Sequence, residues 1–95
     1  MVLWRSKEGI SPDEAKSSIT KLNDFVREQP GFIARKTAMA EDGKFLDLVY
    51  WTDLNSDKRA SENAMKDEDL IPIFNTIDQE GMLFQHFEVF NSIAK

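Results

Sequence analysis

Three side chains of this 95-residue chain suit proton transfer or aromatic recognition: its only histidine, His86, and its two tryptophans, Trp4 and Trp51. An imidazole with an ordinary pKa near ~6.5 can take up and release a proton at neutral pH. The two indole rings could form an aromatic wall against a planar ligand. Each residue also has a structural interpretation, as a histidine hydrogen-bonded within a sheet or a dimer seam and as tryptophans of the core.

Several other kinds of chemistry lack the residues they need. The chain has no cysteine, which excludes disulfides, thiolate catalysis and cysteine-based metal sites. It has no glycine-rich phosphate loop and no serine-containing nucleophile elbow. One histidine and scattered acids do not form the cluster of ligands that a metal site needs. We therefore expect neither a metal nor a cofactor.

The charge distribution argues against two classes of partner. The formal net charge is −5, and the 12 Lys and Arg residues are scattered along the chain. Binding to nucleic acid or to an anionic membrane surface needs a concentrated positive face. No apolar run approaches the ~18 residues that cross a bilayer, and the first residues lack the features of a signal peptide. We expect a cytoplasmic protein that binds neither nucleic acid nor membrane.

The hydrophobic pattern changes between strand and helix along the chain. Residues 2–4 are strand-forming, and Ser11 to Glu14 has a serine N-cap, a proline for the first helical position and the glutamate of a capping box. One uninterrupted helix is predicted to follow, up to Pro30-Gly31. Its apolar stripe consists of Ala15, Ile19, Leu22 and Val26.

Two strand-like runs, residues 32–40 and 44–52, lie on either side of Asp42-Gly43. This dipeptide between β-prone segments indicates a hairpin, because glycine tolerates positive φ. The rest is predicted as a helix at 53–66 capped by Asp53, with Ala60, Ala64 and Met65 inward, a short helix at 70–77 and a strand at 82–90. This order predicts one α+β, ferredoxin-like βαββαβ domain over residues 1–95, with a four-stranded antiparallel sheet and the helices on one face.

The predicted sheet has apolar side chains on both faces. In the third strand, Phe45, Val49 and Trp51 alternate with Leu46, Leu48 and Tyr50. The helices can cover only one face, and the other would be a larger apolar patch than monomers usually expose. We therefore expect a two-fold homodimer that packs sheet against sheet, a dimeric α/β barrel. The alternative is that these positions are simply exposed aliphatic residues.

Five segments carry a resemblance to a known group: Gln29-Pro30-Gly31-Phe32-Ile33, Glu41-Asp42-Gly43, Asp47-Leu48-Val49-Tyr50-Trp51, Phe74-Asn75-Thr76-Ile77-Asp78 and His86-Phe87-Glu88-Val89. With these segments the chain resembles the antibiotic biosynthesis monooxygenase-like branch of the dimeric α/β-barrel superfamily. That superfamily includes cofactor-independent monooxygenases of phenolic or quinol-type substrates, haem-degrading enzymes, isomerases and members without established activity. One fold serves all these chemistries, so the fold alone assigns no reaction.

The resemblance implies a ligand pocket between the sheet and the helices, lined by Phe45 and Trp51. Quinol-oxidising relatives have a polar residue, typically asparagine, four positions before this tryptophan, where this chain has Asp47. An ionised carboxylate donates no hydrogen bond, so Asp47 is a candidate base, or else it simply pairs with Lys36 on the same face. Haem-degrading relatives place an iron-ligating histidine after the second helix, where this chain has none.

Lys36 and Asn63 complete the expected ligand-binding set. With Asp42-Gly43 as a two-residue loop, Lys36 shares the pocket face with Asp47, and Arg35 lies on the opposite face, toward the partner subunit. Asn63 of the second helix could point at the pocket.

Three functions are in competition. The first is a cofactor-independent monooxygenase-like enzyme, in which Trp4 and Trp51 hold a small aromatic or quinol-type substrate and Asp47 or His86 takes its proton. The second is a non-catalytic ligand-binding or assembly module, and isomerase or lyase activity by the same acid–base pair is a third. A helix–sheet cavity that contains Asp47 or His86 favours an enzyme or ligand binder, and a space filled by core side chains favours an assembly module.

Overall fold

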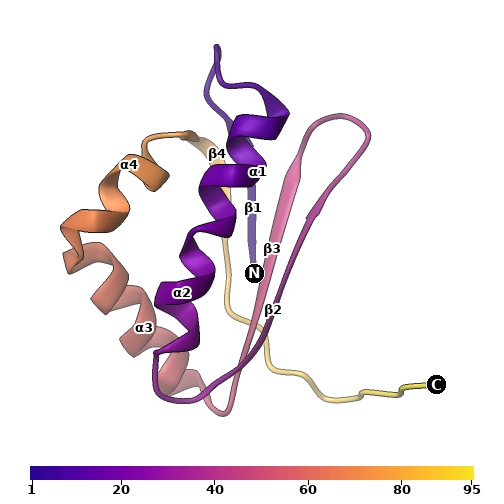
Figure 1. The fold of residues 1–95 in the computed structure, drawn as a ribbon. Coiled ribbons are helices and arrows are strands. Elements are labelled where there is room, and N and C mark those ends of the chain that lie inside the picture. The colour runs from indigo at the N-terminus through magenta and orange to yellow at the C-terminus, as the bar shows by residue number, and fades with distance from the viewer.

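The computed structural model describes residues 1–95. In chain order the elements are β1 (Val2–Ser6), α1 (Pro12–Thr20), α2 (Leu22–Arg27), β2 (Phe32–Met39), β3 (Phe45–Trp51), α3 (Leu54–Lys66), a 3-10 turn η1 (Glu68–Leu70), α4 (Ile71–Phe74) and β4 (Ile77–Phe84). The strands form one antiparallel sheet in the order β2-β3-β1-β4, and the helices all lie on one face of it (Figure 1). The predicted α+β, ferredoxin-like βαββαβ fold is therefore confirmed.

Two helices begin where their capping residues predict. Ser11 Oγ accepts a hydrogen bond from the Glu14 N–H at 3.1 Å at the start of α1. Asp53 accepts one from the Ser56 N–H at 2.7 Å at the start of α3. The single long helix predicted before Pro30 is wrong: α1 and α2 are separated at Lys21, whose N–H bonds the carbonyl three residues back, as in a 3-10 turn. No helix is both long and apolar enough to span a membrane.

The β2–β3 hairpin has a register that differs from the predicted one by one residue. Its loop, Glu41-Asp42-Gly43, has three residues and is closed by a hydrogen bond from the Ala40 N–H to the Lys44 carbonyl at 2.8 Å. Gly43 adopts a φ of +88°, which glycine reaches without steric cost. Three-residue hairpin loops commonly end in such a glycine. Because side chains alternate along a strand, the shift exchanges the two faces of β2.

The predicted positions of Arg35 and Lys36 are consequently both wrong. Arg35 pairs with Val49 and faces the helices, whereas Lys36 pairs with Leu48 on the other side of the sheet. We call that side, which no helix covers, the open face. It carries Leu3, Ala34, Lys36, Ala38, Leu46, Leu48, Tyr50 and Leu83.

The last helix and the last strand both end earlier than predicted. Ile77, predicted as the end of a helix, instead begins β4 by pairing with Ser6 of β1. β4 then stops at Phe84 rather than at Phe90. Phe84, the last residue of β4, pairs with Val2, the first residue of β1.

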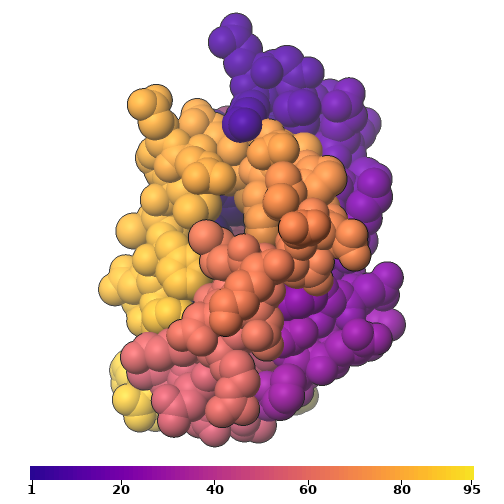
Figure 2. Space-filling view, turned by 90° about the vertical axis from the view of Figure 1, so that its left-hand side faces the viewer, coloured from indigo at the N-terminus to yellow at the C-terminus, as the bar shows by residue number.

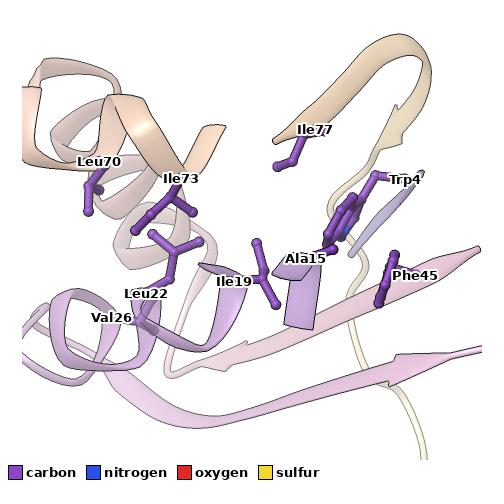
Figure 3. Packing of buried hydrophobic residues seen from close by; sticks show 9 residues of the cluster. All are labelled: Trp4, Ala15, Ile19, Leu22, Val26, Phe45, Leu70, Ile73 and Ile77. Carbon is purple, nitrogen blue, oxygen red and sulfur yellow. The ribbon is translucent and has the colours of Figure 1, made fainter. Parts of the chain in front are cut away.

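The hydrophobic core lies between the sheet and the helices. Its nine buried residues are Trp4, Ala15, Ile19, Leu22, Val26, Phe45, Leu70, Ile73 and Ile77 (Figure 3). Of the α3 residues predicted to face inward, Ala60 is buried and Ala64 packs against this core. Met65 is 83% exposed, so its predicted inward placement is wrong.

Candidate functional site

His86 lies just beyond the end of β4, on the helix-covered side of the sheet. Met1 and Gln85 exchange two backbone hydrogen bonds, of 2.8 and 2.9 Å, which continue the pairing of β1 with β4. Side chains alternate along this continuation, so His86 projects to the same side as Phe84. The two rings meet edge to face, with centroids 5.1 Å apart. Phe84 itself pairs with Val2 on the helix-covered side.

Asp57 of α3 holds the His86 ring in place. Its Oδ2 makes a hydrogen bond with Nδ1 of the imidazole, and the side chains of Asp57 and His86 are 22% and 28% exposed. An ionised carboxylate can only accept, so Nδ1 is the donor. The other ring nitrogen, Nε2, is then the acceptor in the neutral imidazole and has no hydrogen-bond partner within the chain. The arrangement is an imidazole oriented by a carboxylate, with its second nitrogen available.

Asp57 owes its position to the first turn of α3, which is fixed against the sheet. Asp53 caps this turn by accepting a hydrogen bond from the Ser56 N–H. This hydrogen bond holds the pKa of the Asp53 carboxyl below its ordinary value of 3.8. Gly31, the residue before β2, lies close against the first turn of α3. A Cβ at this position would be 2.2 Å from Ser56 Oγ. The Thr52 N–H donates to the Gly31 carbonyl at 2.8 Å. These contacts set the distance from the sheet to the first turn of α3, which carries Asp57.

Asp47, the other predicted proton acceptor, is bound on both carboxylate oxygens. Arg35 donates from Nε to Oδ1 at 3.0 Å and from Nη2 to Oδ2 at 2.7 Å. Its Nη1 donates to the Ile19 carbonyl at 3.1 Å and to Asn23 Oδ1 at 2.8 Å. The arginine and aspartate side chains are only 4% and 11% exposed. The predicted pairing of Asp47 with Lys36 is therefore wrong, because the hairpin register brings Arg35 to that face instead.

The other predicted ligand-binding residues lie in different environments. Trp4 and Phe45 are core residues, 3% and 4% exposed. Trp51 is half-buried at the end of β3. Asn63 is exposed on α3 and donates to Gln29 Oε1 at 2.9 Å, which ties α3 to the loop after α2. Of these residues, Trp51 alone combines a place on the helix-covered face with partial exposure.

Two of the surface pockets lie close to the helices. The smaller, of about 250 Å³, is lined by Asn23, Val26, Arg27, Phe32 and Arg35. The larger, of about 630 Å³, lies between α1–α2 and the η1–α4 segment, and its lining includes Asp24, Glu28, Asp67 and Asp69. Neither lining contains Asp47 or His86. Figure 2 shows a separate hollow on the helix side, between the orange α4 region and the yellow C-terminal region, with indigo N-terminal atoms at its floor.

The sequence does not predict either partner of the two candidate bases. Asp57 is 29 residues from His86, and no helical pattern links it to a residue beyond the last strand. Arg35 is separated from Asp47 by the hairpin, and only the correct loop length puts the two side chains on one face. The available signal was Gly43, whose place after Glu41-Asp42 also suits a three-residue loop.

No protein-family model matches this chain, and no curated protein sequence matches it. Among solved structures, it is similar to SnoaB, a cofactor-independent oxygenase from Streptomyces nogalater. A single-residue mutant of SnoaB gives a TM-score of 0.75 at 16% identity, over 99% of this chain and 93% of that one. A second SnoaB structure gives 0.62 at 20% identity, over 95% and 94%. The resemblance predicted from the sequence is thus confirmed at the level of fold: over nearly its whole length, this chain has the ferredoxin-like fold of SnoaB.

Proposed function

We propose that this chain is a homodimeric, cofactor-independent oxygenase that acts on a small phenol- or quinol-type aromatic compound. The observation that carries the proposal is the His86–Asp57 pair, an imidazole with one nitrogen held by a carboxylate and the other free to accept a proton. The likeness of the fold to that of an oxygenase supports the same class of reaction.

His86 is a better proton acceptor than Asp47. Both oxygens of Asp47 already accept hydrogen bonds from Arg35, so a substrate proton would compete with a buried guanidinium. Asp57 fixes the tautomer of His86 and stabilises the imidazolium that forms when Nε2 takes a proton. General-base catalysis by a positioned side chain contributes about 10²–10⁴-fold to a rate.

The reaction that we propose balances with O₂ as its one co-reactant. His86 removes the phenolic proton, and the electron-rich anion passes one electron to O₂. The two radicals combine at an activated CH₂ carbon of the substrate, which loses its proton and forms a C–O bond. Loss of water from the resulting hydroperoxide leaves a carbonyl. One oxygen atom enters the product, the other leaves as water, and the CH₂ group supplies all four electrons.

Trp51 is the residue that would contact the aromatic ring of the substrate. It is half-buried at the end of β3, on the face that the helices cover. Aromatic rings stack or meet edge to face with gains of about 0.5–1.5 kcal/mol beyond their area burial. Trp4 and Phe45 are stacked within the core and would support this surface without touching a ligand.

The open face supports the homodimer of this proposal. Leu46 and Leu48 are only half-covered there, and Tyr50 and Leu83 are 37% and 47% exposed. Monomers seldom leave such an apolar surface in water. Packing two copies face to face would bury it symmetrically, and a standard interface takes about 800 Å² from each partner.

A non-catalytic binding or assembly module is the second candidate, and the packing of the core favours it. The space between sheet and helices contains the side chains of Trp4, Phe45, Ile73 and Ile77. In that case the His86–Asp57 pair serves to fasten α3 to the edge of the sheet, and no substrate is oxidised.

Oxygen consumption distinguishes the two candidates. The purified protein is given a panel of anthrones and of phenols that carry an activated CH₂ group, and oxygen uptake is followed with catalase and a chelator present. We expect uptake with at least one compound, lowered by about 10²-fold or more in His86→Gln. Lys16→Gln, an exposed substitution on α1, is the matched control and should keep the full rate.

The possible outcomes separate the claims. No uptake on any compound, from protein that circular dichroism shows to be folded, would overturn the oxygenase and favour the assembly module. Uptake that His86→Gln leaves unchanged would overturn the assignment of the base while keeping the class of reaction.

A further inference from the structure

We propose that Asp42 is a site of self-modification, at which the Gly43 nitrogen attacks the Asp42 carboxyl to give isoaspartate, and that Arg5 keeps this site unmodified in the folded chain. The inference concerns the covalent chemistry of the β2–β3 loop. It does not depend on the proposed function, and no part of its test uses oxygen uptake.

The dipeptide Asp42-Gly43 has the composition that this reaction needs. No other aspartate or asparagine of the chain is followed by glycine. A glycine has no side chain to hinder its backbone nitrogen when that nitrogen approaches the preceding carboxyl. The Asp42 side chain is 59% exposed, so water reaches it. Taken alone, the sequence therefore predicts a reactive site in this loop.

The reaction balances with water as its only co-reactant. The Gly43 nitrogen forms a bond to Cγ of the protonated Asp42 carboxyl, and the hydroxyl leaves with the proton of the nitrogen as water. The product is a cyclic succinimide. Water then opens the ring, either at Cγ, which restores aspartate, or at the main-chain carbonyl, which leaves the chain running through Cγ as isoaspartate. No atom is oxidised or reduced.

Arg5 bridges the two groups of Asp42 that must rotate toward each other when the ring closes. Because Trp4 of β1 pairs with Phe45 of β3, the next residue along β1 lies beside the loop. Arg5 Nη2 donates to Asp42 Oδ2 at 3.1 Å, and Nη1 donates to the Asp42 main-chain carbonyl at 2.8 Å. One guanidinium therefore holds the side chain and the main chain of Asp42 in a fixed relation.

Hydrogen bonds within the loop oppose the same attack. The Lys44 N–H donates to Asp42 Oδ1 at 3.0 Å, which directs the carboxyl to the nitrogen two residues on and not to the next one. The Gly43 N–H donates to the Ala40 carbonyl at 3.0 Å. The Lys44 hydrogen bond, helped by the charge of Arg5, lowers the pKa of Asp42 below 3.8. The protonated carboxyl that reacts is therefore scarce at neutral pH.

Isomerisation at Asp42 would disturb the register of the hairpin. Isoaspartate adds one carbon atom to the main chain of a loop whose three residues fit the closing hydrogen bond from Ala40 to Lys44. The register that this loop sets brings Arg35 to the helix-covered face. By keeping Asp42 unmodified, Arg5 protects that register.

Prolonged incubation of the purified protein measures the reaction at this one loop. The unmodified chain, Arg5→Gln and Lys7→Gln are kept for weeks at neutral pH and are then digested with trypsin, which releases residues 37–44 as the same peptide from all three. Reversed-phase chromatography separates the aspartate and isoaspartate forms of this peptide, and mass spectrometry shows that their masses are equal.

We expect Arg5→Gln to form isoaspartate about three- to tenfold faster than the unmodified chain, the range that two hydrogen bonds and an exposed ion pair support. Lys7→Gln removes the same charge from an exposed position just after β1, and it should react at the unmodified rate. The unmodified chain unfolded in urea gives the rate of the free dipeptide, which should exceed both.

Salt provides a test that changes no residue. The Arg5 and Asp42 side chains are 49% and 59% exposed, so their attraction is screened at about 1 M NaCl, where the Debye length falls to about 3 Å. We expect this salt concentration to bring the rate of the unmodified chain toward that of Arg5→Gln. Circular dichroism checks that each sample is folded, and the salt comparison decides if Arg5→Gln is not.

Three outcomes would contradict the proposal, each in a different part. A folded chain that forms isoaspartate as fast as the chain in urea would show that the loop is not protected. An Arg5→Gln protein that reacts at the unmodified rate would show that the hydrogen bonds of the loop suffice without Arg5. An absence of isoaspartate in residues 37–44 even in urea would overturn Asp42 as a site of modification.

Discussion

Trp4 and Phe45 stack across the β1–β3 pair, with ring centroids 4.4 Å apart and planes inclined by 16°. Both rings are almost fully buried. Trp4→Ala leaves a cavity that its neighbours fill only in part, so we expect the free energy of unfolding to fall by about 3–5 kcal/mol. Urea unfolding followed by circular dichroism measures this loss. Trp51→Ala is the comparison, and it should cost distinctly less because Trp51 is half-buried; equal losses would make Trp51 a core residue that no ligand can reach.

The Arg35–Asp47 ion pair predicts that removing one of its two charges lowers stability more than removing both. Arg35→Met leaves a carboxylate buried without its counter-charge, and we expect about 3–5 kcal/mol less stability. Arg35→Met/Asp47→Leu removes both charges and should recover most of that loss. Lys36→Met, on the open face, is the neighbouring control and should not lower stability. Chemical denaturation of the four proteins makes the comparison, and an Arg35→Met protein as stable as the unmodified chain would contradict the pairing.

Asp57 should act on the rate of the proposed reaction more than on substrate affinity. Asp57→Asn keeps the size of the side chain but lets its amide donate to Nδ1 of His86, which favours the wrong tautomer. We expect kcat to fall by about 10²–10⁴-fold with little change in KM. Asp57→Glu restores the carboxylate and should recover part of the rate. A change confined to KM would show that Asp57 serves substrate binding instead.

The cap of α3 predicts a dependence of stability on acid pH. The Ser56 N–H lowers the pKa of Asp53 below 3.8 in the folded chain. The ionised cap therefore contributes stability above the unfolded value, and that contribution is lost as the pH falls through the folded pKa. Asp53→Asn keeps a good N-cap but does not titrate. We expect the unmodified chain to exceed Asp53→Asn in stability at neutral pH, and the difference to vanish in strong acid.

Urea midpoints at several pH values test this prediction. Glu62→Gln, exposed on the same helix, controls for the loss of one negative charge. A difference between the unmodified chain and Asp53→Asn that stays constant from neutral to strongly acid pH would show that the cap does not depend on its charge.

Gly31 predicts a large cost for adding one methyl group. Its φ is +85°, and a Cβ there would lie 2.2 Å from Ser56 Oγ and 2.8 Å from Thr52 Oγ1. Gly31→Ala must shift α3 or β2, and we expect a loss of about 2–4 kcal/mol in unfolding free energy. Gly9→Ala is a matched control, since Gly9 has a φ of +89° but open space around it, and should cost only about 1–2 kcal/mol. Thermal unfolding of both variants tests this prediction. Equal losses of stability would show that Gly31 does not lie in close contact with Ser56 and Thr52.

The starts of α1 and α3 were predictable because capping is local chemistry. Ser11 and Asp53 each bond a backbone N–H three residues on, which the sequence alone indicates. The hairpin was predictable in its existence but not in its register, because Asp42-Gly43 suits loops of two residues and of three. That single residue decides whether Arg35 or Lys36 faces Asp47, and so it decides the composition of the buried polar cluster.

The neighbours of His86 depend on segments far away in the sequence. The last residue of β4, Phe84, pairs with Val2, the first residue of β1. The apolar pattern of the segment continues to Phe90, and it therefore overpredicts the strand. Asp57 meets His86 from the first turn of α3, and this turn packs closely against Gly31.

Arg35 donates hydrogen bonds to the Asp47 carboxylate of β3, to the Ile19 carbonyl near the end of α1, and to Asn23 of α2. One side chain therefore connects three parts of the fold to β2. Neither Arg35 nor Asp47 can be exchanged alone without leaving a charge stranded in the interior. In descendants of this chain the two positions should be inherited as a unit and drift only together, while Lys36 beside them is free to change on its own.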